Sequence, residues 1–205
     1  ALTAAARAIS RDYPSLIVTP RLGDFTTGES PAGATDRAPQ VGFFPGSTIG
    51  NFAPDAAVAL MARIRGLLGA GASLIVGVDL AKDEATLTAA YDDAEGVTAA
   101  FNLNLLSRIN RELGGDFDLA AFAHRAVWNR LEGRMEMHLE ALRTHHAHAA
   151  ARRFSFVRGE TIHTENSYKY SEEGFADLAA RAGWRVTSRW VSPTPGFAVF
   201  LLAGG

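Results

Sequence analysis

The chain has 205 residues, of which 47% are hydrophobic and 20% are charged, and its formal net charge is −2. This size suits one soluble domain or slightly more. The near-neutral net charge argues against nucleic acid or an anionic membrane as a partner, because both bind to positively charged surfaces. The absence of cysteine excludes disulfides, thiolate metal sites and a cysteine nucleophile. No apolar stretch approaches the ~18–20 residues of a membrane span, and no signal peptide opens the chain, so we expect a cytoplasmic protein without a membrane partner.

The first part of the chain predicts a helix, a short strand and a long loop. Residues 2–12 are rich in alanine with apolar side chains on one face, and Tyr13-Pro14 ends this helical pattern. Residues 16–18 form a candidate buried strand. Residues 21–39 are polar and rich in glycine, threonine and proline, and a loop of this length suggests function or disorder.

A strand, a turn, a helix and a second strand follow the loop. The apolar run 41–44 ends in the small-residue turn 45–48, and a helical pattern covers 54–70, with Pro54 in its first turn. Residues 73–78 are continuously apolar, which is typical of a central parallel strand. These elements predict a right-handed βαβ crossover in a parallel sheet.

The middle of the chain predicts two helices and then an antiparallel region. The helices are expected over 82–91 and 98–113, the second with a stripe of Phe101, Leu105, Ile109 and Leu113. Residues 134–141 alternate strictly between polar and apolar, as a half-buried antiparallel strand does. Partner strands are expected over 123–131, 145–150, 153–157 and 161–164.

The last part of the chain predicts a helix and a hairpin. Ser171 is the expected N-cap of a helix over 171–182, and Gly183 follows its end. Residues 184–191 and 197–202 flank a proline- and glycine-rich turn, which predicts two antiparallel strands.

The turn after the first predicted strand is a candidate ligand site. Ligands of open α/β sheets bind at the carboxyl ends of the strands, where Gly46 and Gly50 would let the backbone approach a ligand. Asn51 adds an amide that both donates and accepts. A purely structural turn, with an asparagine near the helix start, explains the same residues.

Three polar residues of a later segment share one strand face. Glu165, Ser167 and Lys169 are spaced by two, and a carboxylate beside a hydroxyl can hold both nitrogens of an imidazole. A charged, solvent-facing edge is the alternative. Tyr91 could donate to a carboxylate ligand or serve as an amphipathic core residue, and its spacing does not decide between them.

The six histidines do not predict a metal site. HExxH is absent, cysteine-bearing spacings are impossible, and His145 and His148 would face opposite ways on a strand. A solvated strand face explains these histidines better, so we expect no metal.

Five segments together resemble a known family. They are GSTIGNF (46–52), GVDLAKD (77–83), AYDDAEGVTAAFNLNLLSRINREL (90–113), RMEMHL (134–139) and TENSYKY (164–170). In this order, over nearly the whole chain, they resemble the S-adenosylmethionine-dependent L-histidine Nα-methyltransferases. That family makes trimethylhistidine (hercynine) on the path to ergothioneine. The resemblance implies S-adenosyl-L-methionine as methyl donor, L-histidine as substrate and a class I, Rossmann-like α/β fold.

The resemblance also implies roles for individual positions. Asn51 and Tyr91 match residues that hold the histidine carboxylate, and Glu165 and Ser167 match the pair that holds the imidazole. Asn166 matches a residue that contributes backbone between that pair, and Met137 matches one that lines the imidazole pocket. Asp24 and Phe25, after Gly23, match the segment that contacts adenine, and Gly46 matches the corner beside the sulfonium.

One departure from the family concerns the cofactor. The acidic, glycine-rich first strand–loop–helix is missing, and the chain starts at Ala1. We therefore expect the carboxyl-terminal portion of such an enzyme, with a sheet that lacks its first strands and that pairs with the missing amino-terminal segment or with itself. The expected domains are a partial methyltransferase core over 1–115 and 171–205 and an antiparallel substrate-binding insertion over 116–170.

Two other functions remain open. One is a catalytically inactive, truncated homologue that binds histidine or serves as an interaction module. The other is methylation of a different amine by the same fold, which is disfavoured because an apolar side chain would leave Glu165 unpaired.

Overall fold

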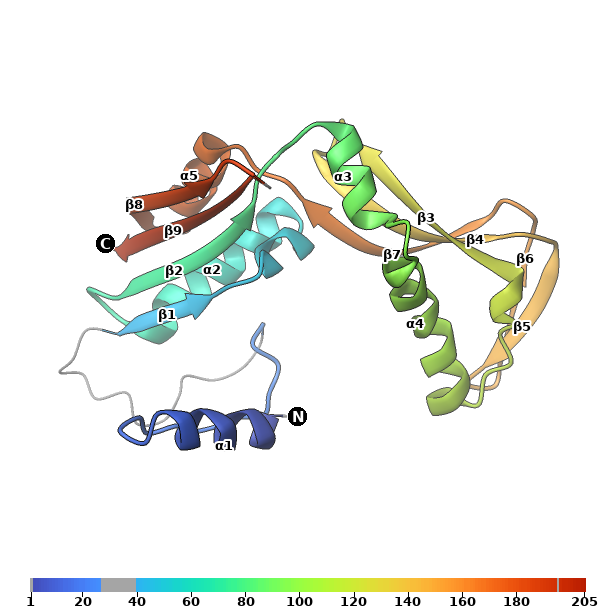
Figure 1. Cartoon of the computed structure of the whole chain (residues 1–205), viewed down its shortest axis with the longest axis horizontal. Helices are drawn as coiled ribbons and strands as arrows, with labels where there is room; N and C mark the ends of the chain where they lie inside the picture. The colour runs from blue at the N-terminus through green and yellow to red at the C-terminus, as the bar shows by residue number, and fades with distance from the viewer. Residues whose placement is uncertain (1, 27–39, 195) are drawn as a thin grey trace. The chain divides into compact units, whose positions relative to one another are not determined.

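The structure is a computed structural model that describes residues 2–26, 40–194 and 196–205 (Figure 1). The chain divides into two compact units, Ala1–Ala34 and Thr35–Gly205. Among the described residues, no helix is both long and apolar enough to cross a bilayer.

The first unit contains helix α1 (Leu2–Asp12), as predicted. The strand predicted over 16–18 is wrong, and Ile17 is 97% exposed. A strand needs a neighbour to satisfy its backbone groups, and the described part of this unit has none. Residues 21–26 form neither helix nor strand, and the rest of the predicted loop, 27–39, lies outside the described residues.

The second unit holds a four-stranded sheet in the order β1-β2-β9-β8. Strands β1 (Val41–Phe44) and β2 (Ser73–Asp79) are parallel and joined through α2 (Pro54–Leu68), which confirms the predicted crossover. The C-terminal hairpin of β8 (Trp184–Ser192) and β9 (Phe197–Gly204) is antiparallel, with β9 against β2.

Helices α2 and α5 (Glu172–Arg181) contact each other and help to close the core of this sheet. Ser171 caps α5 as predicted, because its hydroxyl accepts from the Gly174 N–H at 2.9 Å. The fully buried indole of Trp184 donates to the carbonyl of Met61 on α2 at 2.9 Å, so its polar atom is satisfied inside the core.

A three-stranded antiparallel sheet follows in the order β3 (Phe122–Asn129), β4 (Arg134–Ala141), β7 (Thr161–Tyr168). Strands β5 (His145–Ala149) and β6 (Arg152–Phe156) form a separate hairpin. The alternation of β4 is confirmed, since Met135, Met137, Leu139 and Ala141 are all buried. Strand β7 is longer than the predicted 161–164 and includes the TENSY residues.

Helices α3 (Glu84–Tyr91) and α4 (Val97–Leu113) contact β3 and β4. The domain boundary expected at residue 115 stays a prediction. The buried row of α4 is Asn102 and Leu106, whereas Phe101 on the predicted apolar stripe is 60% exposed. Hydrogen bonds of the buried Asn102 amide to strands β3 and β4 fix this rotation of the helix.

Asn110 at the end of α4 holds the following loop. Its amide accepts from the Phe117 N–H and donates to the Phe117 carbonyl, both at 2.8 Å. We expect Asn110→Ala to lower the free energy of unfolding by about 1–3 kcal/mol, because both backbone groups of the buried Phe117 lose their partner. Urea unfolding measures this loss. The exposed Asn104 on the same helix is the matched control, and Asn104→Ala is expected to be neutral or slightly stabilising. Equal losses in both variants would contradict this role of Asn110.

Candidate functional site

The candidate site forms where the turn after β1 meets β7. Residues Thr48–Asn51 make a short 3-10 helix, η1, and its Gly50 lies against β7 so closely that a Cβ would come within 2.8 Å of the Tyr168 carbonyl. The adjoining cleft has a volume of about 470 Å³ and is lined by Asn51, His163, Thr164, Glu165 and Asn166. Two segments more than 100 residues apart in the sequence therefore share one cleft.

The corner at the end of β1 is a tight left-handed turn. Gly46 has φ 75° and Ser47 has φ 55°. The Ser47 hydroxyl accepts from the Asp79 N–H at 2.9 Å, which ties the carboxyl ends of β1 and β2 together. A Cβ at Gly46 would meet nothing within 4 Å, so the space beside this corner is open.

A buried polar cluster lies beside the cleft. The Lys169 ammonium, whose side chain is 0% exposed, contacts Asp79 Oδ2 at 2.7 Å, the Tyr91 hydroxyl at 2.8 Å and the Ser167 hydroxyl at 2.8 Å. The Tyr91 hydroxyl donates to Ser167 Oγ at 2.7 Å. Lys82 pairs with the other oxygen of Asp79. The cluster thus connects the end of β2, the end of α3 and strand β7.

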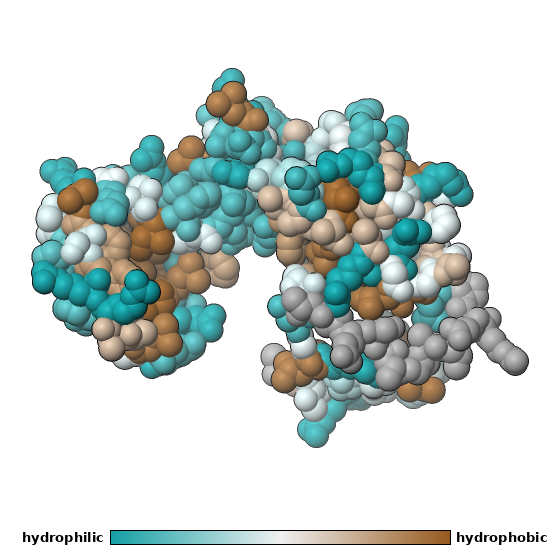
Figure 2. Space-filling view, turned by 180° about the vertical axis from the view of Figure 1, so that it is seen from behind, coloured by the Kyte–Doolittle hydropathy of each residue, from teal (hydrophilic) through white to brown (hydrophobic). Residues whose placement is uncertain are grey.

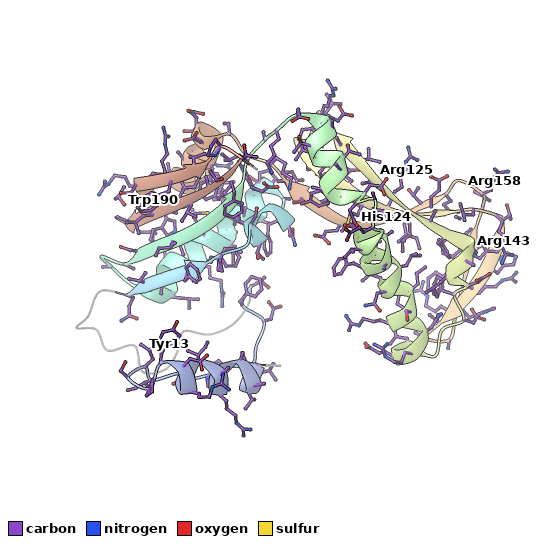
Figure 3. All side chains as sticks on the ribbon, viewed as in Figure 1. Tyr13, His124, Arg125, Arg143, Arg158 and Trp190 are labelled. Carbon is purple, nitrogen blue, oxygen red and sulfur yellow. The ribbon has the colours of Figure 1, made fainter. Side chains whose placement is uncertain are left out.

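His124 on β3 fixes the end of α3 (Figure 3). The Asn102 Nδ2 group lies 3.0 Å from both His124 Nδ1 and the His138 carbonyl. An amide nitrogen only donates, so His124 Nδ1 accepts, and Nε2 must carry the proton that it donates to the Tyr91 carbonyl at 2.7 Å. This chain of bonds holds Tyr91 in place beside Ser167.

Glu165 stands across from Met137 in the register of β7 and β4, and Ser167 stands across from Met135. Directly paired residues share one face of a sheet, so the carboxylate and hydroxyl lie on the face of the buried methionines. Burial raises the pKa of the Glu165 carboxyl, and the positive charge of Lys169 partly offsets this rise.

Asn166 lies on the other face of β7, across from Glu136. Its Oδ1 is buried and has no hydrogen-bond partner among the residues that the structure describes.

The residues predicted to contact adenine, Asp24 and Phe25, belong to the first unit. The Asp24 carboxylate accepts there from the N–H and the hydroxyl of Thr26. Their roles stay predictions.

Three side chains near the cleft, Glu136, His138 and His163, have atoms of the kind that bind metals. One carboxylate oxygen and one nitrogen of each imidazole lie within 4.8 Å of one another. However, Arg134 and Asn129 already bond to one Glu136 oxygen, and the adjacent guanidinium would repel a dication. Desolvation raises the pKa of Glu136, but these hydrogen bonds and one from His138 outweigh it and lower the pKa to about 2. The two histidine rings stack at 4.5 Å. Ion pairing and stacking explain the cluster, and the expectation of no metal stays a prediction.

A larger, mainly apolar cavity of about 720 Å³ lies between α4 and the β5–β6 hairpin, lined among others by Leu105, Ile109, Phe154 and Phe156. Figure 2 shows exposed hydrophobic residues in the part that holds β3 to β7. His163 and Thr164 line both this cavity and the cleft. This cavity is lined by none of the predicted substrate residues, so the smaller cleft is the candidate substrate site.

Sequence reasoning missed most of the polar support of the site. The period of two placed Lys169 on the face of Ser167, but it did not show that Lys169 would be buried against Asp79. The signal for Asp79 was an acidic residue at the carboxyl end of a central apolar strand. Nothing in the sequence indicated that His124 and Asn102 would hold Tyr91.

Comparisons with known proteins point to one family. A family model described as "Histidine-specific methyltransferase, SAM-dependent" matches residues 1–204. A protein named histidine N-alpha-methyltransferase from Mycolicibacterium smegmatis is 42% identical over 98% of this chain, and one of the same name from Mycobacterium tuberculosis is 38% identical over 98%. The chain spans 62% and 63% of the lengths of these two relatives.

One solved structure shows the fold. The CcbJ methyltransferase from Streptomyces caelestis superposes with a TM-score of 0.50 at 13% identity, covering 100% of this chain and 75% of that chain. At this identity the likeness concerns the fold alone, and it confirms the methyltransferase α/β class expected from the sequence.

Proposed function

Because this chain belongs to the family of S-adenosylmethionine-dependent, histidine-specific methyltransferases, we propose that it serves the transfer of methyl groups to the α-amino group of L-histidine, giving trimethylhistidine. The observation that carries this proposal is that Asn51 and Glu165 line one cleft and that the Ser167 hydroxyl lies on the same face of β7 as the Glu165 carboxylate.

Each end of L-histidine has a chemical counterpart in this region. The imidazole has one N–H and one lone pair, which a carboxylate and a hydroxyl can satisfy together. The Asn51 amide can donate to the substrate carboxylate. The resemblance also assigns Tyr91 to this carboxylate, but the Tyr91 hydroxyl donates to Ser167 in this structure, so Asn51 is the donor that we propose. Met137, buried across from Glu165, offers an apolar contact to the ring.

The corner at Gly46 fits the proposed methyl donor. The space where a side chain would stand is open, so a ligand can approach the backbone closely. Gly46 would lie beside bound S-adenosylmethionine, and the adenine contacts expected of Asp24 and Phe25 stay predictions. When bound, this cosubstrate supplies an electrophilic methyl group on a sulfonium.

The residues of the chain then contribute to the reaction by orienting the substrate amine. Methyl transfer to nitrogen is an in-line displacement that needs a neutral amine lone pair close to the methyl carbon. Holding both ends of histidine restricts the position of that amine, and well-arranged cases of such orientation offset ~7–11 kcal/mol of a barrier. Buried polar groups left unpaired by another amino acid would supply specificity.

The test is a methylation assay read by mass spectrometry. We expect mono-, di- and trimethylhistidine, with the added mass on the α-nitrogen, when the protein is incubated with S-adenosylmethionine and L-histidine. If a second copy of the chain completes the site, the rate per chain rises with protein concentration. Histidine binding without any methylated product would instead favour a histidine-binding module, and the absence of both binding and product would overturn the proposal.

A further inference from the structure

Lys169 is the buried centre of the polar cluster beside the cleft. Its ammonium has three N–H donors and no acceptor, and three oxygens lie within 2.7–2.8 Å of it, on Asp79, Tyr91 and Ser167. All of its protons are therefore used inside the protein. Lys169 has none left for a ligand, although it stands next to the hydroxyl that is proposed to touch the substrate.

This arrangement limits how many protons the neighbouring hydroxyls can offer. Tyr91 and Ser167 together own two hydroxyl protons, and Lys169 can only donate to their oxygens. One hydroxyl proton is used in the 2.7 Å bond between Tyr91 and Ser167. Whichever way that bond points, a single hydroxyl proton of the pair remains for another acceptor. With Tyr91 as the donor, the remaining proton belongs to Ser167.

We propose that Lys169 is a positioning residue that leaves the Tyr91–Ser167 pair with one outward proton, so that the site selects a neutral imidazole bound through its unprotonated ring nitrogen. This inference rests on the proposed function and adds the protonation state of its substrate. The outward hydroxyl proton needs an acceptor, which the unprotonated nitrogen of a neutral imidazole provides. An imidazolium carries N–H on both nitrogens, so it would place a second donor against this proton.

Glu165 completes the selection from the other side of the ring. Its carboxylate accepts, so the ring nitrogen that faces it carries the proton, and one tautomer satisfies both residues. The charged groups around Lys169 are Asp79 and Lys82 at the end of β2 and Glu165 on β7, with the Tyr91 hydroxyl on α3. The Lys169 charge acts on Glu165 and favours its ionised, accepting form.

The direct test is nuclear magnetic resonance of ring-¹⁵N-labelled L-histidine bound to the protein. We expect one protonated and one unprotonated ring nitrogen, with separate signals, in the wild type. In Lys169→Met, the released hydroxyls can either donate or accept, so both tautomers of the ring can bind. We therefore expect the signals of the two ring nitrogens to average. Asp79 keeps Lys82 as its counterion in this variant, and the double variant Asp79→Asn/Lys169→Met removes both charges if the single one does not fold.

Affinity as a function of pH gives a second readout. From pH 7.5 to 5.5, wild-type affinity is expected to fall about tenfold or more, because the neutral fraction of an imidazole with a pKa near ~6.5 falls by about that factor. The loss should be smaller in Lys169→Met. A merely structural role would lower affinity equally at every pH. Lys82→Met is the matched control, since it also takes a lysine from Asp79 but leaves the hydroxyl pair with Lys169.

The outcomes separate the two proposals. If the wild type does not bind L-histidine, the proposed function fails and this inference fails with it. If the wild type binds, but Lys169→Met shows the same single tautomer and the same pH dependence, only the role of Lys169 is overturned.

Discussion

Replacing Glu165 with glutamine is expected to weaken L-histidine binding by about 10- to 100-fold and to leave S-adenosylmethionine binding unchanged. Glutamine keeps the shape of the side chain but replaces a charged acceptor by a neutral one. A hydrogen bond to a charged group contributes ~1.5–3 kcal/mol, and each ~1.4 kcal/mol corresponds to tenfold in affinity. Titration calorimetry with each ligand measures both affinities.

The same substitution should not destabilise the fold. Burial raises the pKa of the Glu165 carboxyl above its ordinary value of 4.5. The folded state therefore binds the proton more tightly than the unfolded state, and stability falls as pH rises through the raised pKa. At pH 7 the ionised carboxylate opposes folding, so Glu165→Gln should have an equal or higher melting temperature.

The exposed Glu95 provides the matched control for this experiment. Glu95→Gln should change neither histidine affinity nor stability. A Glu165→Gln variant that loses affinity and melting temperature together would show that Glu165 holds the fold, and the assignment of its carboxylate to the imidazole would then lose its support.

The second large effect is expected from Gly50→Ala. The new Cβ would lie 2.8 Å from the Tyr168 carbonyl, a backbone atom that cannot turn away. Either η1 or β7 must shift, which separates Asn51 from Glu165 and Ser167. We expect a loss of about 1–3 kcal/mol in the free energy of unfolding and a methylation rate lower by up to about 100-fold, as for a misplaced reactant.

Gly66 in α2 is the matched control for this loss, because a Cβ there meets nothing within 4 Å. Gly66→Ala should stabilise the protein by about 0.5–1 kcal/mol through the better helix propensity of alanine and should leave the rate unchanged. Normal histidine affinity and rate in Gly50→Ala would mean that the contact between η1 and β7 does not set the geometry of the site.

The local elements of the second unit could be predicted because they depend on nearby residues. The alternation of β4 gave its buried face, and the Ser171 cap gave the start of α5. The apolar run of β2 gave the parallel crossover. In the first unit, three apolar residues at 16–18 looked like a strand, but strand formation depends on a partner that a local pattern does not reveal.

The placement of the candidate residues could be predicted only where local patterns determine it. The period of two predicted the shared strand face of Glu165 and Ser167, and the position of Asn51 after a strand and a turn predicted its place at the sheet edge. The partners of Tyr91 lie 76 and 78 residues further along the chain, at Ser167 and Lys169. The rotation of α4 depends on the buried Asn102. Such long-range pairings follow from tertiary packing, which hydropathy and spacing along the chain do not report.

The central claim is that L-histidine binds in the cleft of Asn51 and β7. A crystal structure of the protein with L-histidine tests it most directly. We predict that the imidazole lies within hydrogen-bond distance of the Glu165 carboxylate and the Ser167 hydroxyl, with the substrate carboxylate toward Asn51. Histidine bound instead in the apolar cavity between α4 and the β5–β6 hairpin, or bound with its ring away from Glu165, would contradict the account.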